Sequence, residues 1–206
     1  MSAPEPRPAA VLVHGIMDRG GIFTALRSSL ARASIDSHAP DLTPNHGGAP
    51  IERLADQLAH YVAHHIPPKT PLHLVGFSMG AIVSRYYLQR LGGAARASQF
   101  LSVCAPHQGT RWAHLGPLVG MRQMAPGSDF LTSLDEDVES LASLAVTCYW
   151  TPYDLVIVPA TSAQLALADN VRVPSLCHQC ILRHHQLHAD VCRRIGDLAS
   201  PRTVYE

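Results

Sequence analysis

The sequence predicts a domain of the α/β class, with a mostly parallel central sheet and helices on both faces. Short continuous apolar runs of strand length alternate with segments that have the periodicity of helices. The chain has 206 residues, 47% of them hydrophobic, which suits one core. No internal repeat is present, so we expect a single domain over residues 1–206.

The expected elements alternate along the chain. The expected strands, each a short apolar run or an extended segment next to turn residues, are 9–14, 34–42, 72–77, 99–105, 144–150 and 170–176. In the expected helices, apolar residues recur every three or four positions. These helices are 22–30, 51–65, 81–91, 134–143 and 183–198. This order is typical of parallel strands joined by crossover helices.

Composition narrows the function classes. Lys and Arg number 16 and Asp and Glu number 16, without a basic stripe, so nucleic acid is not an expected partner. No apolar run is long enough to span a bilayer, and the first residues lack the pattern of a signal peptide. We therefore expect a cytoplasmic protein, or a mature form whose leader was removed. The five cysteines form an odd set, for which reduced thiols are the simpler interpretation.

One serine lies in an unusual position. Ser78 follows the expected strand 72–77 directly and is flanked by Gly76 and Gly80. A sharp strand-to-helix turn leaves no room for side chains two residues before and after the serine, and it points the hydroxyl into open space. Carboxyl ends of parallel strands are where reactive groups gather. The pattern favours a nucleophile, and the alternative is a glycine-rich turn with a serine N-cap.

Five motifs occur in a recognisable order: VLVHGI, VGFSMG, SVCAPHQGT, YWTPYDLVIVP and NVRVPSLCHQCIL. In order and spacing the chain resembles the α/β-hydrolase superfamily over roughly residues 9–198, and most of all its small bacterial lipases and esterases. The resemblance implies a minimal α/β-hydrolase fold and cleavage of carboxylic esters through an acyl-enzyme. It implies no metal and no organic cofactor.

The resemblance also implies an oxyanion hole. In the similar enzymes the residue after the His-Gly pair donates one backbone N–H, and the residue after the nucleophile donates the other. Here these are Ile16 and Met79, with Met17 as a neighbour expected to contact substrate. The alternative interpretation makes His14-Gly15 an ordinary turn at the end of a strand.

The acid and base should follow later strands in the order Ser, Asp, His. Asp154 comes just after the expected strand 144–150, and His178 comes after 170–176. A base belongs on a loop at a strand end, which favours His178 over His184 or His185 in the last helix. If the strand is instead LCHQCIL, His184 becomes the residue after the strand. Other acids that fit less well are Asp41, Asp129 and Asp135.

Other patterns have competing interpretations. Cys177 and Cys180 form a C-x-x-C pair, which in a cytosolic α/β protein can be a redox motif, and this rival interpretation predicts that one of them is reactive. The i,i+4 histidine pairs His60/His64 and His184/His188 have the spacing of zinc ligands but no third ligand, so solvated polar faces explain them better.

Residues 106–143 are the expected cap or substrate-facing insert. The segment is rich in apolar residues, including Trp112, which we expect to contact substrate. The alternative is that it packs as ordinary core. The predicted function is a lipase or esterase acting on a small-molecule ester or lipid, with transient contact to a lipid surface. Alternatives are an acyltransferase or thioesterase with the same triad, or a non-catalytic binding protein. The sequence does not give the oligomeric state.

Overall fold

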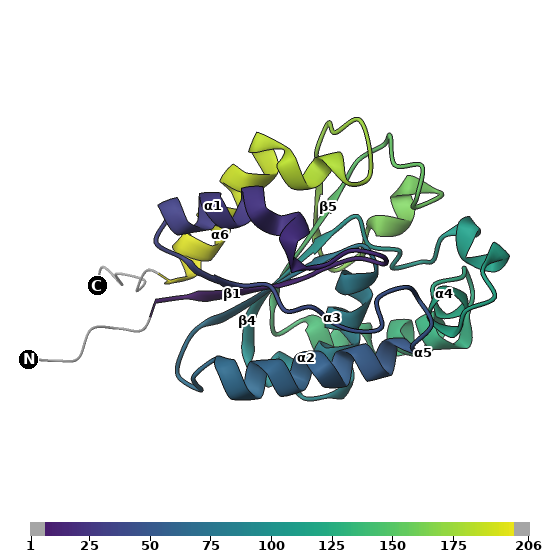
Figure 1. Ribbon diagram of the computed structural model, residues 1–206, viewed down its shortest axis with the longest axis horizontal. Helices are drawn as coiled ribbons and strands as arrows, with labels where there is room; N and C mark the ends of the chain where they lie inside the picture. The colour runs from purple at the N-terminus through teal and green to yellow at the C-terminus, as the bar shows by residue number, and fades with distance from the viewer. Residues whose placement is uncertain (1–6, 200–206) are drawn as a thin grey trace, which may run out of the picture.

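A six-stranded parallel sheet forms the centre of the molecule (Figure 1). The structure is a computed structural model that describes residues 7–199. The strand order is β2-β1-β3-β4-β5-β6, and every neighbouring pair is parallel. The strands are β1 (Ala9–Val13), β2 (Asp36–His38), β3 (Leu72–Phe77), β4 (Ala97–Val103), β5 (Ala145–Trp150) and β6 (Asp169–Arg172).

Helices cover both faces of this sheet. The α-helices are α1 (Thr24–Arg32), α2 (Ile51–His65), α3 (Met79–Arg90), α4 (Val119–Gln123), α5 (Asp129–Glu136) and α6 (His185–Ala199). Short 3₁₀ turns are η1 (Gly20–Phe23), η2 (Gly93–Ala95), η3 (Arg111–Leu115), η4 (Val138–Leu141), η5 (Ala160–Ala163) and η6 (Cys180–Arg183). Figure 1 shows α1 and α6 on one side of the sheet, and α2, α3 and α5 on the other.

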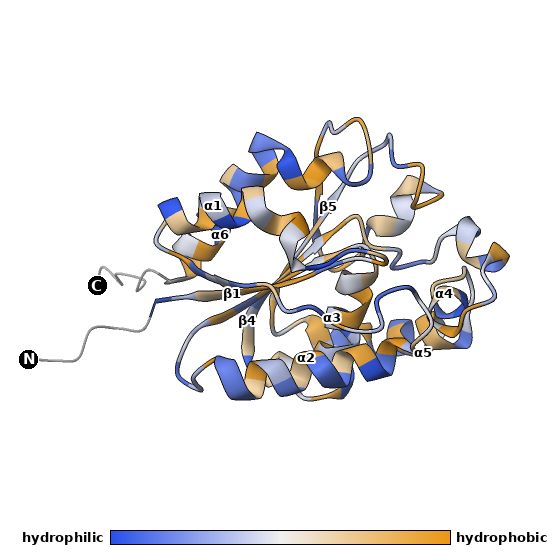
Figure 2. Cartoon of the chain, viewed as in Figure 1, coloured by the Kyte–Doolittle hydropathy of each residue, from blue (hydrophilic) through white to orange (hydrophobic). Residues whose placement is uncertain are grey.

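Alternation along the strands divides the core in two. In β1, Val11 and Val13 pack toward α2 and α3, whereas Ala10 and Leu12 pack toward α1 and α6. All five residues of β1 are buried, as a strand covered on both faces requires. Figure 2 shows the same division, with hydrophobic ribbon lining the interior and hydrophilic stretches on the outer sides of the helices.

The fold class predicted from the sequence is confirmed. The expected bounds of 51–65 and 72–77 agree with α2 and β3. Three other bounds were wrong: β2 is only Asp36–His38, β6 ends at Arg172, and the expected helix 134–143 is split between α5 and η4. β2 and β6 are the two edge strands, where fewer backbone partners extend the pairing.

No helix within residues 7–199 is both long and apolar enough to cross a membrane. The first six residues, on which the leader expectation partly rests, lie outside the described range.

A buried arginine ties α3 to the segment between β4 and β5. Arg85 has no exposed side-chain surface, and its Nη2 donates to Oδ1 of Asp135 at 2.7 Å. Its Nε donates to Gln89 at 2.8 Å, whereas its Nη1 is buried without a partner in the part of the chain described. A buried charge is tolerable only while its partner stays in place. The pair therefore fixes α5 against the helix that follows Ser78.

We expect Asp135→Ala to lower the free energy of unfolding by about 2 kcal/mol or more, because it leaves the buried guanidinium unpaired. Arg85→Met should cost less, since it removes the buried charge itself. The measurement is urea unfolding followed by circular dichroism. The control is Asp137→Ala, which breaks the more exposed pair with Arg90 and should cost about 1 kcal/mol or less. Equal losses in the Asp135 and Asp137 variants would contradict the argument.

Candidate active site

The carboxyl ends of four strands meet at one edge of the sheet. The register pairs Val13 of β1 with Gly76 of β3, Phe77 with Val103 of β4, and Val103 with Tyr149 of β5. The residues that follow these strands are therefore brought together. They include every residue that the sequence analysis assigned to the nucleophile, the oxyanion hole and the acid.

Ser78 lies on a sharp turn between β3 and α3. Its φ of 53° and ψ of −124° are unusual for a residue other than glycine. A Cβ on Gly76 would lie 2.4 Å from Cα of Ala81, and a Cβ on Gly80 would lie 2.1 Å from the carbonyl oxygen of Val13. The two glycines thus allow helix, strand and turn to approach closely, as the sequence pattern predicted.

The hydroxyl of Ser78 faces two cavities. The hydroxyl oxygen makes no hydrogen bond to residues 7–199. It is also not fully buried, so it is accessible from the cavities. The larger cavity has a volume of about 410 Å³ and is also lined by His178. The smaller, of about 90 Å³, lies on the side of residues 106–124.

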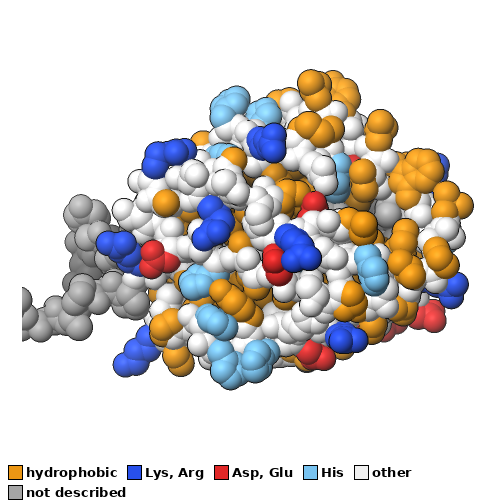
Figure 3. All heavy atoms as spheres, viewed as in Figure 1, with side chains coloured by type: hydrophobic (Ala, Val, Ile, Leu, Met, Phe, Trp, Pro, Cys, Tyr) orange, Lys and Arg blue, Asp and Glu red, His pale blue; other side chains and the backbone are white. Residues whose placement is uncertain are grey.

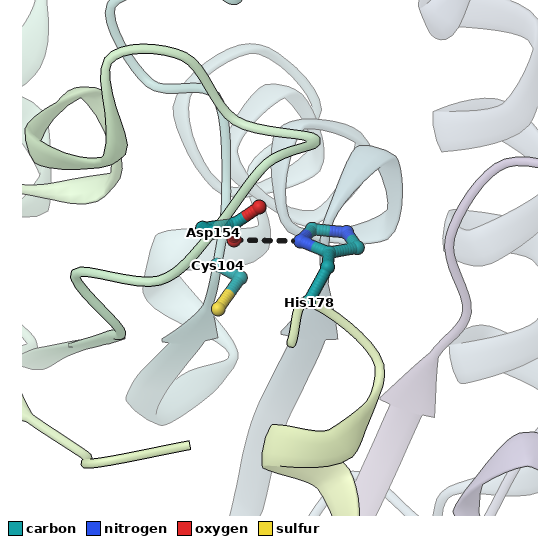
Figure 4. Close-up of side chains that lie close together, drawn as sticks. All are labelled: Cys104, Asp154 and His178. Atoms are coloured by element: carbon teal, nitrogen blue, oxygen red, sulfur yellow. Dashed lines mark hydrogen bonds and ion pairs between the residues drawn. The ribbon is translucent and has the colours of Figure 1, made fainter. Parts of the chain in front are cut away.

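Asp154 and His178 form a buried hydrogen-bonded pair (Figure 4). Oδ2 of Asp154 lies 2.7 Å from Nδ1 of His178, which donates its proton to the carboxylate. Oδ1 accepts the backbone N–H groups of Val156 and Ile157. Burial alone would raise the pKa of Asp154, but the hydrogen bond and charge of His178, with these two amides, outweigh it and lower the pKa. The carboxylate is held ionised, with both oxygens occupied.

With its Nδ1 proton given to Asp154, a neutral His178 has an unprotonated Nε2. The ring of His178 also packs on Phe77, with ring centroids 4.8 Å apart. Phe77 is the residue directly before Ser78, so this contact holds the imidazole next to the turn. Within residues 7–199 no hydrogen bond joins Ser78 to His178, although both line the same cavity.

The loop that carries His178 is closed by a disulfide bond between Cys177 and Cys180. The expectation of reduced thiols is therefore wrong for this pair; Cys104, Cys148 and Cys192 are free. The expected strand 170–176 ends early, which leaves His178 on a loop six residues beyond β6. Proximity in sequence makes a Cys-x-x-Cys bridge feasible, but pairing cannot be read from spacing alone.

The other histidines near the C-terminus lie elsewhere. His184 and His185 stack on each other at the start of α6, with centroids 4.7 Å apart. Neither is among the residues that line the two cavities at Ser78 within the described chain. His188 bonds to Ser29 and to the carbonyl of Leu182 instead. The structure brings His178, and not His184 or His185, to Asp154.

The residues expected for the oxyanion hole differ in their placement. Ile16 lines both cavities, and Met79 begins α3, where first-turn amides lack helical partners. Met17 does not line either cavity among the described residues: its side chain is 73% exposed, and its N–H donates to the carbonyl of Asn45. The structure does not bring Met17 to the site.

Two residues at the site had no signal in the sequence. Asp18 lines the larger cavity, and burial raises its pKa, partly opposed by His14 and His178. Cys104 follows β4 with a φ of 47° and lies beside Asp154 in Figure 4. Asp18 comes four residues after the expected strand 9–14, whereas Cys104 falls inside the expected strand 99–105, so neither residue was singled out.

Cys104, Asp154 and His178 offer one ligand atom each within 4.8 Å of one another, a spacing that a metal ion could bridge. However, burial and the neighbouring Asp154 raise the pKa of the Cys104 thiol well above its usual value. Asp154 and His178 also bond to each other through Oδ2 and Nδ1, and Oδ1 of Asp154 accepts two backbone N–H groups. The three groups fit better as a carboxylate that accepts from an imidazole and lies beside a neutral thiol.

Trp112 lines the smaller cavity and joins two loops. Its Nε1 donates to the carbonyl of Leu155 at 2.8 Å. Met121 and Met124 lie on the same wall. Other residues of the expected insert, Leu131, Leu134 and Leu141, are buried in the core. One part of the segment therefore packs as core, and another part lines the smaller cavity beside Ser78.

A sequence model of the alpha/beta hydrolase family matches residues 10–189, and the chain belongs to this family. The fold resembles the mature Bacillus licheniformis lipase BlEst2, with a TM-score of 0.74, 15% identity, and coverage of 95% of this chain and 94% of that one. The fold also resembles Aspergillus fumigatus lipase B, with a TM-score of 0.80 and 14% identity, over 92% of this chain and 52% of that one.

The pyrethroid hydrolase PytH is also similar, with a TM-score of 0.67 and 15% identity over 94% of this chain and 99% of that one. At these identities the solved structures establish the shared fold. Together with the family, they support a hydrolase.

Opening the disulfide bond should lower stability. By the chain-entropy relation, closing a loop of four residues contributes about 2 kcal/mol. We expect reduction, or the double change Cys177→Ser and Cys180→Ser, to lower the free energy of unfolding by about that amount. Hydrogen exchange should quicken around His178. The measurement is urea unfolding with and without a dithiol reductant, and the double variant should not respond to the reductant. An equal response in both proteins would contradict the prediction.

Proposed function

We propose that this protein is a serine hydrolase that cleaves carboxylic esters through an acyl-enzyme. The observation that carries the proposal is the hydrogen-bonded pair of Asp154 and His178 in the same cavity as the open hydroxyl of Ser78. A serine hydroxyl needs a base to become a nucleophile, and an oriented base needs a partner for its other nitrogen. Hydrogen bonds of this kind often tighten only with substrate bound, so the missing Ser78–His178 bond is compatible with the proposal.

In the proposed reaction, Oγ of Ser78 attacks the acyl carbon while Nε2 of His178 takes the hydroxyl proton. The carbon–oxygen bond to the leaving alcohol then breaks, and His178 gives that proton to the alcohol oxygen. Water attacks the acyl-enzyme in the same way and releases the acid. Asp154 keeps the Nδ1 proton of His178 in place and stabilises the imidazolium.

The amides of Ile16 and Met79 would stabilise the negative oxygen that forms in both steps. His14 supports this role for Ile16. The N–H of Leu42 donates to Nε2 of His14, so Nδ1 carries the proton and donates to the carbonyl of Gly15. That carbonyl and the N–H of Ile16 belong to one planar trans peptide and point in opposite directions. His14 thereby fixes the direction of the N–H before substrate arrives, which is what oxyanion stabilisation requires.

The smaller cavity is proposed to hold the acyl chain, and the wall supplied by residues 106–124 is the substrate-facing part of the insert. A cavity of about 150 Å³ holds a ligand the size of benzene, so 90 Å³ holds roughly three or four carbon groups. This supports short acyl chains. Methionines at Met121 and Met124 suit a flexible apolar chain.

The surface around the site supports transient contact with a lipid surface. Several large exposed apolar side chains lie on loops and short helices beyond the strand ends: Trp112, Leu115, Val119, Tyr153, Leu155, Val156 and Leu176. Figure 3 shows apolar side chains gathered toward the right of the molecule, where Figure 1 places α4 and the loops around it.

No metal or organic cofactor is needed for the proposed reaction. The cytoplasmic location expected from the sequence stays a prediction. The Cys177–Cys180 disulfide bond favours an oxidising compartment instead.

The decisive test compares histidines. His178→Ala should lower kcat for a nitrophenyl ester by about 10⁴-fold or more, and Ser78→Ala should do the same. His184→Ala is the matched control and should stay near wild type, because His184 does not contact Asp154. Fluorophosphonate labelling followed by intact mass should be lost in Ser78→Ala. Collapse of activity in His184→Ala with little effect in His178→Ala would contradict the assignment.

A panel of nitrophenyl esters from two to sixteen carbons tests the acyl cavity. We expect kcat/KM to be highest at about four carbons or fewer, because longer chains exceed the cavity. Met121→Trp should shift the optimum to shorter chains, because the larger side chain fills part of the cavity. Leu115→Trp, on an exposed side chain of the same segment, should leave the profile unchanged. An unchanged profile in Met121→Trp would place the acyl chain elsewhere.

A further inference from the structure

Asp18 places a negative charge in the larger cavity. Among the described residues that line this cavity, it carries the only carboxylate, and neither lysine nor arginine lines it. The carboxylate lies across Gly15 from the nucleophile: a Cβ on Gly15 would be 3.1 Å from Oδ2 of Asp18 and 3.1 Å from Cβ of Ser78. The charge is therefore close to the reacting centre.

This carboxylate is not neutralised by the protein. Within residues 7–199 no arginine or lysine pairs with Asp18, and the side-chain bond it accepts comes from the neutral amide of Gln179 at 3.3 Å. The nearby His14 is buried in two other hydrogen bonds. His178 uses its Nδ1 for Asp154. The negative charge of Asp18 is thus available to a ligand in the cavity.

The larger cavity is the side of the leaving group. His178 must reach the leaving oxygen to protonate it, and His178 lines the larger cavity but not the smaller one. Ile16, Ser78 and Val156 line both cavities, so they mark where the ester group would lie between them. An alcohol part placed beside His178 would then lie beside Asp18 and Tyr153.

We propose that Asp18 selects the leaving group by charge, so that esters of cationic alcohols, such as quaternary ammonium or amino alcohols, are preferred over neutral and anionic ones. The inference rests on the proposed ester hydrolysis and names the substrate class of that same site. Tyr153 adds a second attraction, because its half-exposed ring lines the same cavity and aromatic faces attract cations.

The expected size of the preference is about tenfold in kcat/KM, since Asp18 is partly exposed and water weakens the attraction. Salt should reduce the preference for the same reason. A neutral substrate of equal shape gains nothing from the carboxylate. An anionic substrate is repelled and must also lose its hydration.

The experiment uses three butyrate esters of phenols that differ only at the meta position: trimethylammonium, tert-butyl and sulfonate. The first two are equal in shape and differ in charge. Each kcat/KM is divided by the rate of hydroxide hydrolysis to remove the effect of the leaving group's pKa. Wild type should prefer the cation by about tenfold over the neutral ester, and Asp18→Asn should bring that ratio to within about twofold of one. Asp56→Asn makes the same change of net charge on the exposed face of α2 and should keep the wild-type ratio.

A ratio unchanged by Asp18→Asn, while hydrolysis still depends on Ser78, would overturn the inference and leave the proposed function standing. Hydrolysis independent of Ser78 would overturn the proposed function. A binding measurement then still decides the inference: calorimetry of 3-hydroxy-N,N,N-trimethylanilinium and 3-tert-butylphenol with Ser78→Ala. Adding Asp18→Asn to that protein should weaken binding of the cation about tenfold and change binding of the neutral phenol little. Equal changes in affinity for both compounds would reject the role of Asp18.

Discussion

The close approach of α3 to the end of β1 is the constraint on which the rest of the site depends. The carbonyl of Val13 occupies the space that a side chain at Gly80 would need. Because Gly80 has no side chain to meet this carbonyl, the chain can turn at Ser78. Ser78 itself has a backbone conformation that few residues other than glycine adopt. The same approach places the end of β1, and hence His14 and Ile16, beside the serine. One steric condition therefore positions both the hydroxyl and one wall of the two cavities.

Much of this could be predicted because it is local. The glycine spacing around Ser78 and the apolar run before it determine the turn, and Asp154 follows its strand closely. The loop of His178 was harder, because β6 is an edge strand that ends at Arg172 and the chain then continues without regular pairing. The disulfide bond and the cavity position of Asp18 depend on tertiary contacts, which neighbouring sequence does not specify. Met17 has a left-handed φ and an exposed side chain, and its contact with substrate stays a prediction.

The segment between β4 and β5 contributes both to the core and to one wall of the smaller cavity. The later part of the segment packs leucines into the core and pairs with the buried Arg85 through an ion pair. The earlier part forms the cavity wall that contains Trp112 and Met121. The hydrogen bond from Trp112 to Leu155 joins this wall to the loop that carries Asp154. The wall of the smaller cavity is therefore linked by this hydrogen bond to the loop of Asp154.

The ring contact between Phe77 and His178 has a consequence for biosynthesis. It joins two positions that lie a hundred residues apart along the chain, and the second of them emerges late from the ribosome. Until the loop of His178 packs on Phe77, the turn at Ser78 has no imidazole beside it. A chain that lacks this loop would thus keep the turn at Ser78 but have no imidazole next to it.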